Sequence, residues 1–273
     1  MKDTALEAVL RRDGVVVRAA LIAVTALAWG YVIWLAADMD MRAADMAGWR
    51  MIPAGMGLMV PALAPWHGLE FALVLAMWMV MMLGMMTPSA APMILIYARM
   101  GRLSAARGTP FAATGWFAAG YLLVWSAFSL AATAAQWALQ RAALLDSNMS
   151  AGGAVPAAVI LIAAGVYQWT SLKAGCLRQC RAPFAFIQRQ RGFRRDARGA
   201  LRLGLKHGAY CLGCCWMLMA LLFAGGVMNV LWIAAITLVV LAEKILPAGW
   251  LLSRISGVAF AAAGAWLLLR SAL

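Results

Sequence analysis

The chain has 273 residues, of which 65% are hydrophobic and only 12% are charged, and its mean hydropathy is +0.84. This composition excludes an ordinary soluble domain, in which about a quarter of the residues are charged. A formal net charge of +13 would suggest nucleic acid binding in a soluble protein, but beside a bilayer the same cations report topology. We therefore expect one polytopic membrane domain over 1–273, with the lipid bilayer and no nucleic acid as partner.

Apolar runs of about 20 residues, the length that crosses a hydrocarbon core about 30 Å thick, recur along the whole chain. The sequence predicts an all-α membrane helix bundle with about seven transmembrane helices, at 16–37, 71–99, 111–140, 155–172, 208–224, 227–242 and 251–269. In the second of these, Pro88 and Pro92 each remove a backbone donor. We expect that helix to be broken there and to face other protein, because lipid cannot satisfy the freed carbonyls.

Basic residues concentrate in every second segment that connects the predicted spans, and so on one side of the membrane. Ten of them lie between 173 and 206, and the N-terminal segment holds four more. The positive-inside rule then puts the N-terminus and the 173–206 loop in the cytoplasm and the C-terminus outside. The protein is expected in the bacterial inner membrane, with an acidic, methionine-rich outer loop at 38–70.

All five cysteines lie near the two ends of the basic 173–206 loop, two just inside its start and three just after its end. Cys176 and Cys180 are spaced i, i+4, and Cys211, Cys214 and Cys215 are spaced i, i+3, i+4, so each group would share one helix face. Both groups are expected at the cytoplasmic interface, the second in the first turns of its span. Because the cytoplasm keeps thiols reduced, a metal or redox role is favoured over structural disulfides.

Sulfur ligands select soft metals, above all Cu(I), and thiolates also bind zinc. Methionines continue the sulfur pattern along the second span and just after the thiols, as a copper path from an oxidising exterior would require. The predicted metal ligands are Cys176, Cys180, Cys211, Cys214, Cys215, Met81, Met82, Met85, Met86, Met217, Met219 and His207. The competing interpretation is that these cysteines and methionines simply fill an apolar core.

Three stretches carry a family resemblance: 81–92 (MMLGMMTPSAAP), 165–183 (GVYQWTSLKAGCLRQCRAP) and 204–232, with Glu243-Lys244 following them. Together they resemble a bacterial family of uncharacterised, predicted metal-binding integral membrane proteins. The resemblance implies a metal-linked membrane role and fixes no reaction. Thr170-Ser171 stands where the resemblance leads us to expect a proline.

Motifs for catalysis are missing from the sequence: it has no phosphate-binding glycine loop, no HExxH and no paired carboxylates at catalytic spacing. We therefore expect a non-enzymatic protein that transports or delivers Cu(I), with a membrane or periplasmic protein as a further partner. Two alternatives remain, a dithiol redox protein and an assembly scaffold that packs on partners through small residues such as Gly120, Gly225 and Gly226. Glu243 and Lys244 are interpreted as a snorkelling pair near an interface, and His67 as a solvated loop residue.

Overall fold

The computed structural model describes residues 5–40, 49–52, 59–61, 64–106, 108, 114–145, 149–190, 192 and 196–272. These residues are helical apart from turns and one short antiparallel ribbon, in which Trp49 faces Pro61. The elements are α1 (Ala5–Asp40), β1 (Trp49–Met51), β2 (Met59–Pro61), α2 (Gly68–Ala106), α3 (Thr114–Arg141), α4 (Ala154–Tyr167), α5 (Ser171–Arg181), α6 (Pro183–Arg189), α7 (Ala197–Ala220), α8 (Leu222–Gly225), α9 (Val230–Ile245) and α10 (Gly249–Ala272). The predicted all-α class is confirmed.

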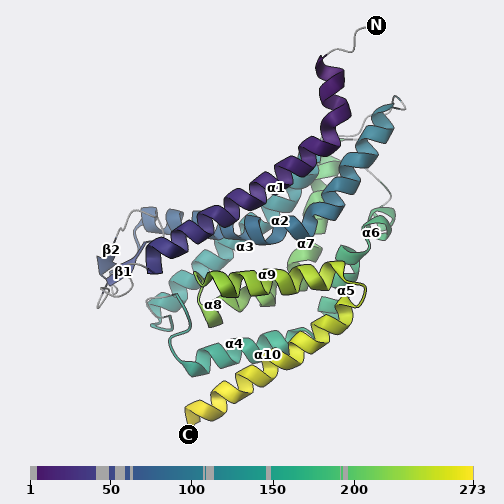
Figure 1. Cartoon of the computed structure of the whole chain (residues 1–273). Helices are drawn as coiled ribbons and strands as arrows, with labels where there is room; N and C mark the ends of the chain where they lie inside the picture. The colour runs from purple at the N-terminus through teal and green to yellow at the C-terminus, as the bar shows by residue number, and fades with distance from the viewer. Residues whose placement is uncertain are drawn as a thin grey trace.

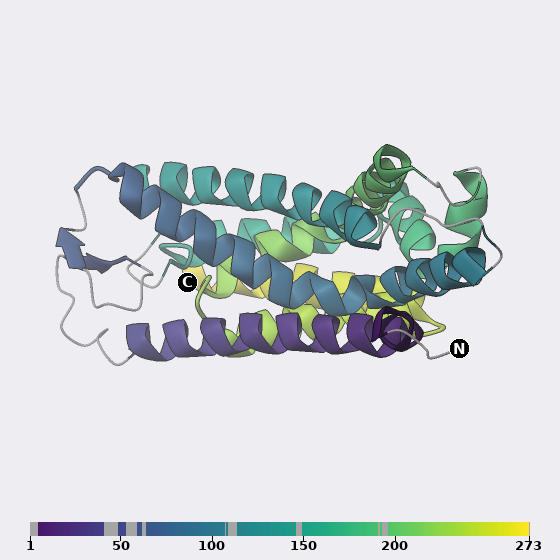
Figure 2. The ribbon, with the colours of Figure 1, turned by 90° about the horizontal axis from the view of Figure 1, so that it is seen from above.

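Helix α9 lies between two groups of helices (Figure 1). On one side α1 packs on α2, α2 on α3, and α3 on α7; on the other side α4 runs along α10. Helix α9 touches α2 and α7 from the first group and α10 from the second. Seen from above, the ribbon β1–β2 lies at one end of the bundle and α6 at the other (Figure 2).

Glycines allow α3 and α7 to pack with their backbones in contact. A Cβ placed on Gly204 would lie 2.0 Å from the carbonyl oxygen of Phe117, and one on Gly120 would lie 2.2 Å from that of Leu201. Any side chain larger than hydrogen would separate the two helices. Gly120 therefore packs against α7 of the same chain. Gly225 also packs within the chain, because the indole of Trp232 covers it.

Five helices of the described residues are long and apolar enough to cross a membrane, judged by length and composition: Val15–Asp38, Gly68–Ala105, Thr114–Arg141, Ala197–Gly225 and Gly249–Ser271. A sixth results if α4 and α5, which meet at a 66° bend, are one broken span. The predicted count of about seven is not confirmed. The sequence pattern divided 208–242 into two spans, whereas α7 and α8 form one and α9 has 16 residues.

The backbone break lies at a different place from the one predicted. Helix α2 continues through Pro88 and Pro92, and its Met86 carbonyl accepts hydrogen bonds from Ser89 Oγ (2.9 Å) and Tyr121 Oη (3.2 Å). The chain bends instead between α4 and α5, inside the predicted span 155–172. There Thr170 caps α5, its Oγ1 accepting from the Lys173 amide at 3.3 Å, so a hydroxyl residue performs the local role for which we expected proline.

Much of the predicted 173–206 loop is helical. It contains α5, α6 and the first turns of α7, and Lys173 is buried rather than solvated. Among its other cations, Arg191, Arg194 and Arg195 lie outside the described residues, as do the outer-loop residues Met41, Met46 and Met56 and the start of the predicted span 111–140. The interpretation of those segments stays a prediction.

Candidate metal centre

The sulfur cluster lies on the middle of α7 and not at its N-terminal end. Because α7 begins at Ala197, Cys211 lies about 21 Å along the helix axis at 1.5 Å per residue. Cys211, Cys214 and Cys215 are each 1% exposed. The spacing prediction is confirmed in that the three occupy consecutive turns of one helix, but their expected position at the start of a span is wrong, since the amphipathic basic segment extends the helix.

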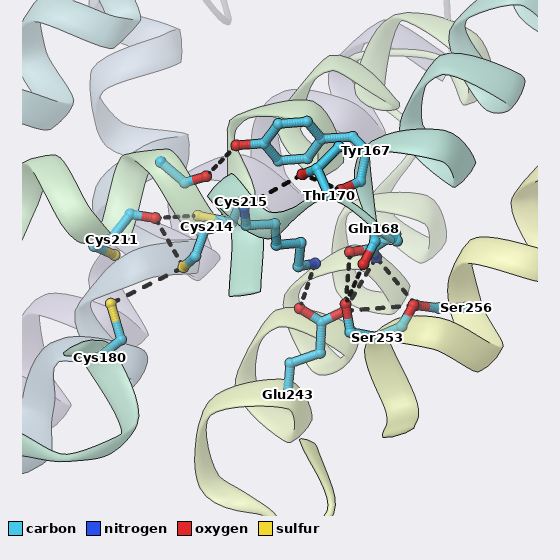
Figure 3. A network of polar contacts seen from close by, with 12 residues as sticks. Tyr167, Gln168, Thr170, Cys180, Cys211, Cys214, Cys215, Glu243, Ser253 and Ser256 are labelled. Carbon is cyan, nitrogen blue, oxygen red and sulfur yellow. Dashed lines mark hydrogen bonds and ion pairs between the residues drawn. The ribbon is translucent and has the colours of Figure 1, made fainter. Parts of the chain in front are cut away.

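The two cysteine groups, separated by more than 30 residues, meet. Cys180 Sγ of α5 lies 4.0 Å from Cys214 Sγ of α7 (Figure 3). Cys176, one turn earlier on α5, lies against Gly213 of α7. A Cβ added to Gly213 would be 2.7 Å from Cys176 Sγ. The bend after α4 lays α5 along α7, and Tyr167 Oη fixes the junction by donating to the Gly213 carbonyl at 2.5 Å.

Cys211 differs from its neighbours because it accepts a hydrogen bond from a cation. Lys244 Nζ of α9 lies 3.0 Å from Cys211 Sγ, and Tyr121 Oη of α3 lies 3.1 Å from the same sulfur. Lys244 also donates to Ser89 Oγ at 3.0 Å. A buried ammonium needs acceptors in place of water, and Cys211 Sγ and Ser89 Oγ supply two here.

The other two thiols on α7 act as donors. Cys214 Sγ and Cys215 Sγ donate to the Cys211 carbonyl at 3.0 and 2.9 Å. Cys215 Sγ also lies 4.0 Å from Met86 Sδ of α2. A thioether from one helix and four thiols from two others therefore border the same small volume, with Cys176 as the fifth thiol at its edge.

A second polar cluster lies beside the sulfurs. Glu243 forms a 2.7 Å ion pair with Lys173, and both side chains are almost fully buried. Gln168 Nε2 donates to Glu243 Oε1 and to Ser256 Oγ, each at 3.0 Å, and Ser253 Oγ donates to Gln168 Oε1 at 3.0 Å. The interpretation of Glu243 and Lys244 as a snorkelling pair is wrong: on successive positions of α9 they point into two buried clusters.

His207 is held in an aromatic cage. Its ring centroid lies 5.9 Å from that of Phe117, 5.8 Å from that of Tyr121 and 5.4 Å from that of Phe186. The ring is buried, and Nδ1 has no hydrogen-bond partner among the described residues. His207 is thus one turn before Cys211 on α7, as the spacing predicted, and its role as a ligand stays a prediction. His67 is exposed, as expected.

The methionines of the predicted path are core residues. Met81, Met82, Met85 and Met86 are at most 2% exposed, Met219 is fully buried and Met217 is partly buried. Met86 is the one among them whose sulfur has a cysteine contact in the part of the chain described. A continuous ligand row along α2 therefore stays a prediction, while packing accounts for the burial of the row.

The residues described hold no group of three or more His, Cys, Asp or Glu side chains arranged to take a metal ion. The geometry instead offers pairs. At a metal–sulfur distance of about 2.3 Å, two sulfurs 4.0 Å apart subtend an angle of about 120° at a shared ion. A pair of this kind suits a soft ion of low coordination number and leaves a four-coordinate zinc ion two ligands short.

Three residues next to the thiols were not identified from the sequence. Tyr121 and Ser89 bracket Cys211 and Lys244, and Tyr167 holds α4 against α7. Their positions depend on helix packing across long separations, which no local pattern encodes. Ser89 and Tyr167 do lie inside the stretches that carry the family resemblance.

Comparison with known proteins gives one family. No curated protein and no solved structure matches the chain. A family model described as PpoB2, copper chaperone, matches residues 75–267, which include α5, α7 and α9 complete and most of α2. The metal-related bacterial family expected from the sequence is thereby confirmed, and the chain belongs to the PpoB2 copper chaperone family.

Proposed function

We propose that the protein binds Cu(I) between α5 and α7 and holds it inside a membrane helix bundle for delivery to a partner protein. The observation that carries this proposal is the 4.0 Å separation of Cys180 Sγ and Cys214 Sγ, two thiols that the fold brings together across 34 residues. Membership of the copper chaperone family supports the same metal. Thiolates and thioethers are the ligands that favour Cu(I).

Charge supports a monovalent ion. Two thiolates and Cu(I) together carry one negative charge, which the Lys244 ammonium beside Cys211 neutralises. Two thiolates and a divalent ion are neutral and would leave Lys244 as an unbalanced buried cation, which costs several kcal/mol in a low-dielectric interior. Glu243 does not offset that charge, because Lys173 already pairs with it.

The setting supports a membrane chaperone rather than an enzyme. Five or six helices have the length and composition of membrane spans, and the basic residues favour an inner-membrane protein with a cytoplasmic N-terminus. Among the described residues, the buried side chains around the thiols are sulfur, aromatic, hydroxyl and ion-paired groups. Holding and releasing the ion is the activity that these groups support.

Cu(I) titration of the purified full-length protein tests the proposal. In anaerobic detergent solution, competition with a coloured Cu(I) chelator should give about one tightly bound ion. The Cys180→Ser/Cys214→Ser double variant should lose it, and X-ray absorption of the loaded protein should show sulfur ligands. Tight binding that survives the double variant would remove this pair from the function.

The same distance favours a dithiol redox role as the second candidate. Thiols 4.0 Å apart need to approach by about 2 Å to form a disulfide, whose S–S bond is about 2.05 Å. In that case the metal-free protein should form a Cys180–Cys214 disulfide with mild oxidant and exchange it with added dithiols. A protein that binds Cu(I) and keeps this pair reduced in cells would exclude the redox role.

A further inference from the structure

A cavity of about 570 Å³ opens beside the cysteine at the edge of the sulfur cluster. Cys176 lines it, together with Arg178, Gln179, Arg189 and Tyr210. Its walls come from α5, α6 and α7, at the end of the bundle opposite the ribbon β1–β2 (Figure 2). A thiol and two guanidinium groups around one hollow form a set that neither helix packing nor the family match explains.

Two neighbouring cysteines of α5 connect the cavity to the buried thiols. Cys176 and Cys180 are one helical turn apart, a spacing at which side chains are about 5–6 Å apart, and Cys180 reaches Cys214. Cys176 is only partly buried, in contrast to the fully buried thiols on α7. It is therefore the thiol that a molecule in the cavity can meet first.

Size and charge indicate what fits. Cavities of about 300–1,000 Å³ accommodate small molecules, so 570 Å³ suits a compound of tripeptide size and no folded domain. Arg178 and Arg189 offer planar donors that match carboxylates. A carrier for Cu(I) must itself contribute soft sulfur, since the free ion is not stable as a cargo in a thiol-rich cytoplasm.

We propose that this cavity binds a small carboxylate-bearing thiol that carries Cu(I), and that Cys176 exchanges the ion with it. This inference rests on the proposed Cu(I) function. In the exchange a bond forms between Cys176 Sγ and copper, and one bond between copper and a carrier thiolate breaks. The proton of Cys176 passes to the departing thiolate, and copper stays Cu(I), so no oxidant or reductant is required.

Glutathione, with one thiol and two carboxylates, serves as the probe, and its diethyl ester, with the same thiol and no carboxylate, serves as the comparison. Cu(I) should pass between glutathione and the full-length protein on the order of tenfold faster than with the ester, as expected for charge-assisted hydrogen bonds. The Arg178→Gln/Arg189→Gln variant should remove the difference. Arg198→Gln, an exposed cation on α7 away from the cavity, is the control and should keep it. Equal rates for both carriers with the unmodified protein would overturn the proposal, even with Cu(I) binding intact.

A metal-free readout separates this inference from the Cu(I) function. Glutathione disulfide should form a mixed disulfide at Cys176 faster than its ethyl ester does, with release of one glutathione thiolate, as mass spectrometry of the modified protein would show. That preference should disappear in the double arginine variant. A protein that binds no copper but keeps the preference would refute the proposed function alone, whereas the absence of any preference at Cys176 would refute the cavity site.

Discussion

Lys244 Nζ and Cys211 Sγ lie 3.0 Å apart in the interior of the bundle, where a helix-borne ammonium and a thiol from another helix form a buried pair. The ammonium has a second partner, Ser89 Oγ of α2, also at 3.0 Å. Three helices therefore meet at one cation. The pair places a fixed positive charge beside the sulfurs, and this charge determines how much cationic charge a bound ion can add.

Replacement of Lys244 by methionine should change metal preference. Without the ammonium, two thiolates and Cu(I) keep an unbalanced negative charge, while two thiolates and Zn(II) are neutral. Lys244→Met is expected to weaken Cu(I) binding by about tenfold or more, which corresponds to about 1.4 kcal/mol, and to improve Zn(II) binding. Chelator competition with each metal measures both effects. Lys206→Met, at an exposed lysine bonded to Gln190, is the control, and an unchanged ratio of the two affinities in Lys244→Met would contradict the charge argument.

Met86 and Met79 provide a matched pair on α2. Met86 is buried with its Sδ 4.0 Å from Cys215 Sγ, whereas Met79 is 42% exposed. Met86→Leu keeps the volume and removes the thioether, so it should lower Cu(I) affinity several-fold and leave folding little changed. Met79→Leu should bind as the unmodified protein does. Equal affinities for the two variants would mean that the methionines of α2 act as packing.

The sequence was sufficient for the helical class, the two cysteine groups and the family. Whether Cys180 and Cys214 converge could not be read from the sequence, because their 4.0 Å separation depends on how α5 packs along α7. The sequence could not locate the bend at 168–170, where a threonine cap rather than a proline ends one helix and starts the next. Nor could it assign Glu243 and Lys244, because adjacent charges near a helix end look the same whether they reach solvent or two buried partners. The start of α7 was misplaced since its first turns are basic and amphipathic, not apolar.

The stability of the fold should depend on whether one or both charges of the buried Lys173–Glu243 pair are removed. Glu243→Gln leaves the Lys173 ammonium buried without a counter-charge and should destabilise the fold by about 3–5 kcal/mol. The Lys173→Met/Glu243→Gln double variant removes both charges and should regain much of that loss. Thermal unfolding in detergent, followed by tryptophan fluorescence, gives the order of the melting temperatures. A double variant less stable than Glu243→Gln would show that the pair matters through something other than charge balance.

Gly204 and Gly101 test the contact between α3 and α7. Gly204→Ala puts a Cβ 2.0 Å from the Phe117 carbonyl oxygen and should cost roughly 1–3 kcal/mol as the helices separate. Gly101 of α2 has open space around it, so Gly101→Ala should stabilise by up to about 1 kcal/mol through helix propensity. Opposite shifts of the melting temperature are expected. A tolerated alanine at 204 would mean that the two helices are farther apart in solution.

Glu243 and Lys244 are joined by a single peptide bond, about 1.5 Å of helix rise. The ammonium belongs to the sulfur cluster, and the carboxylate next to it in sequence belongs to the cluster that joins α5 to Gln168, just after α4, and to Ser256 of α10. The two buried clusters therefore share one stretch of α9 backbone, so a substitution that shifts this turn of α9 should disturb both of them.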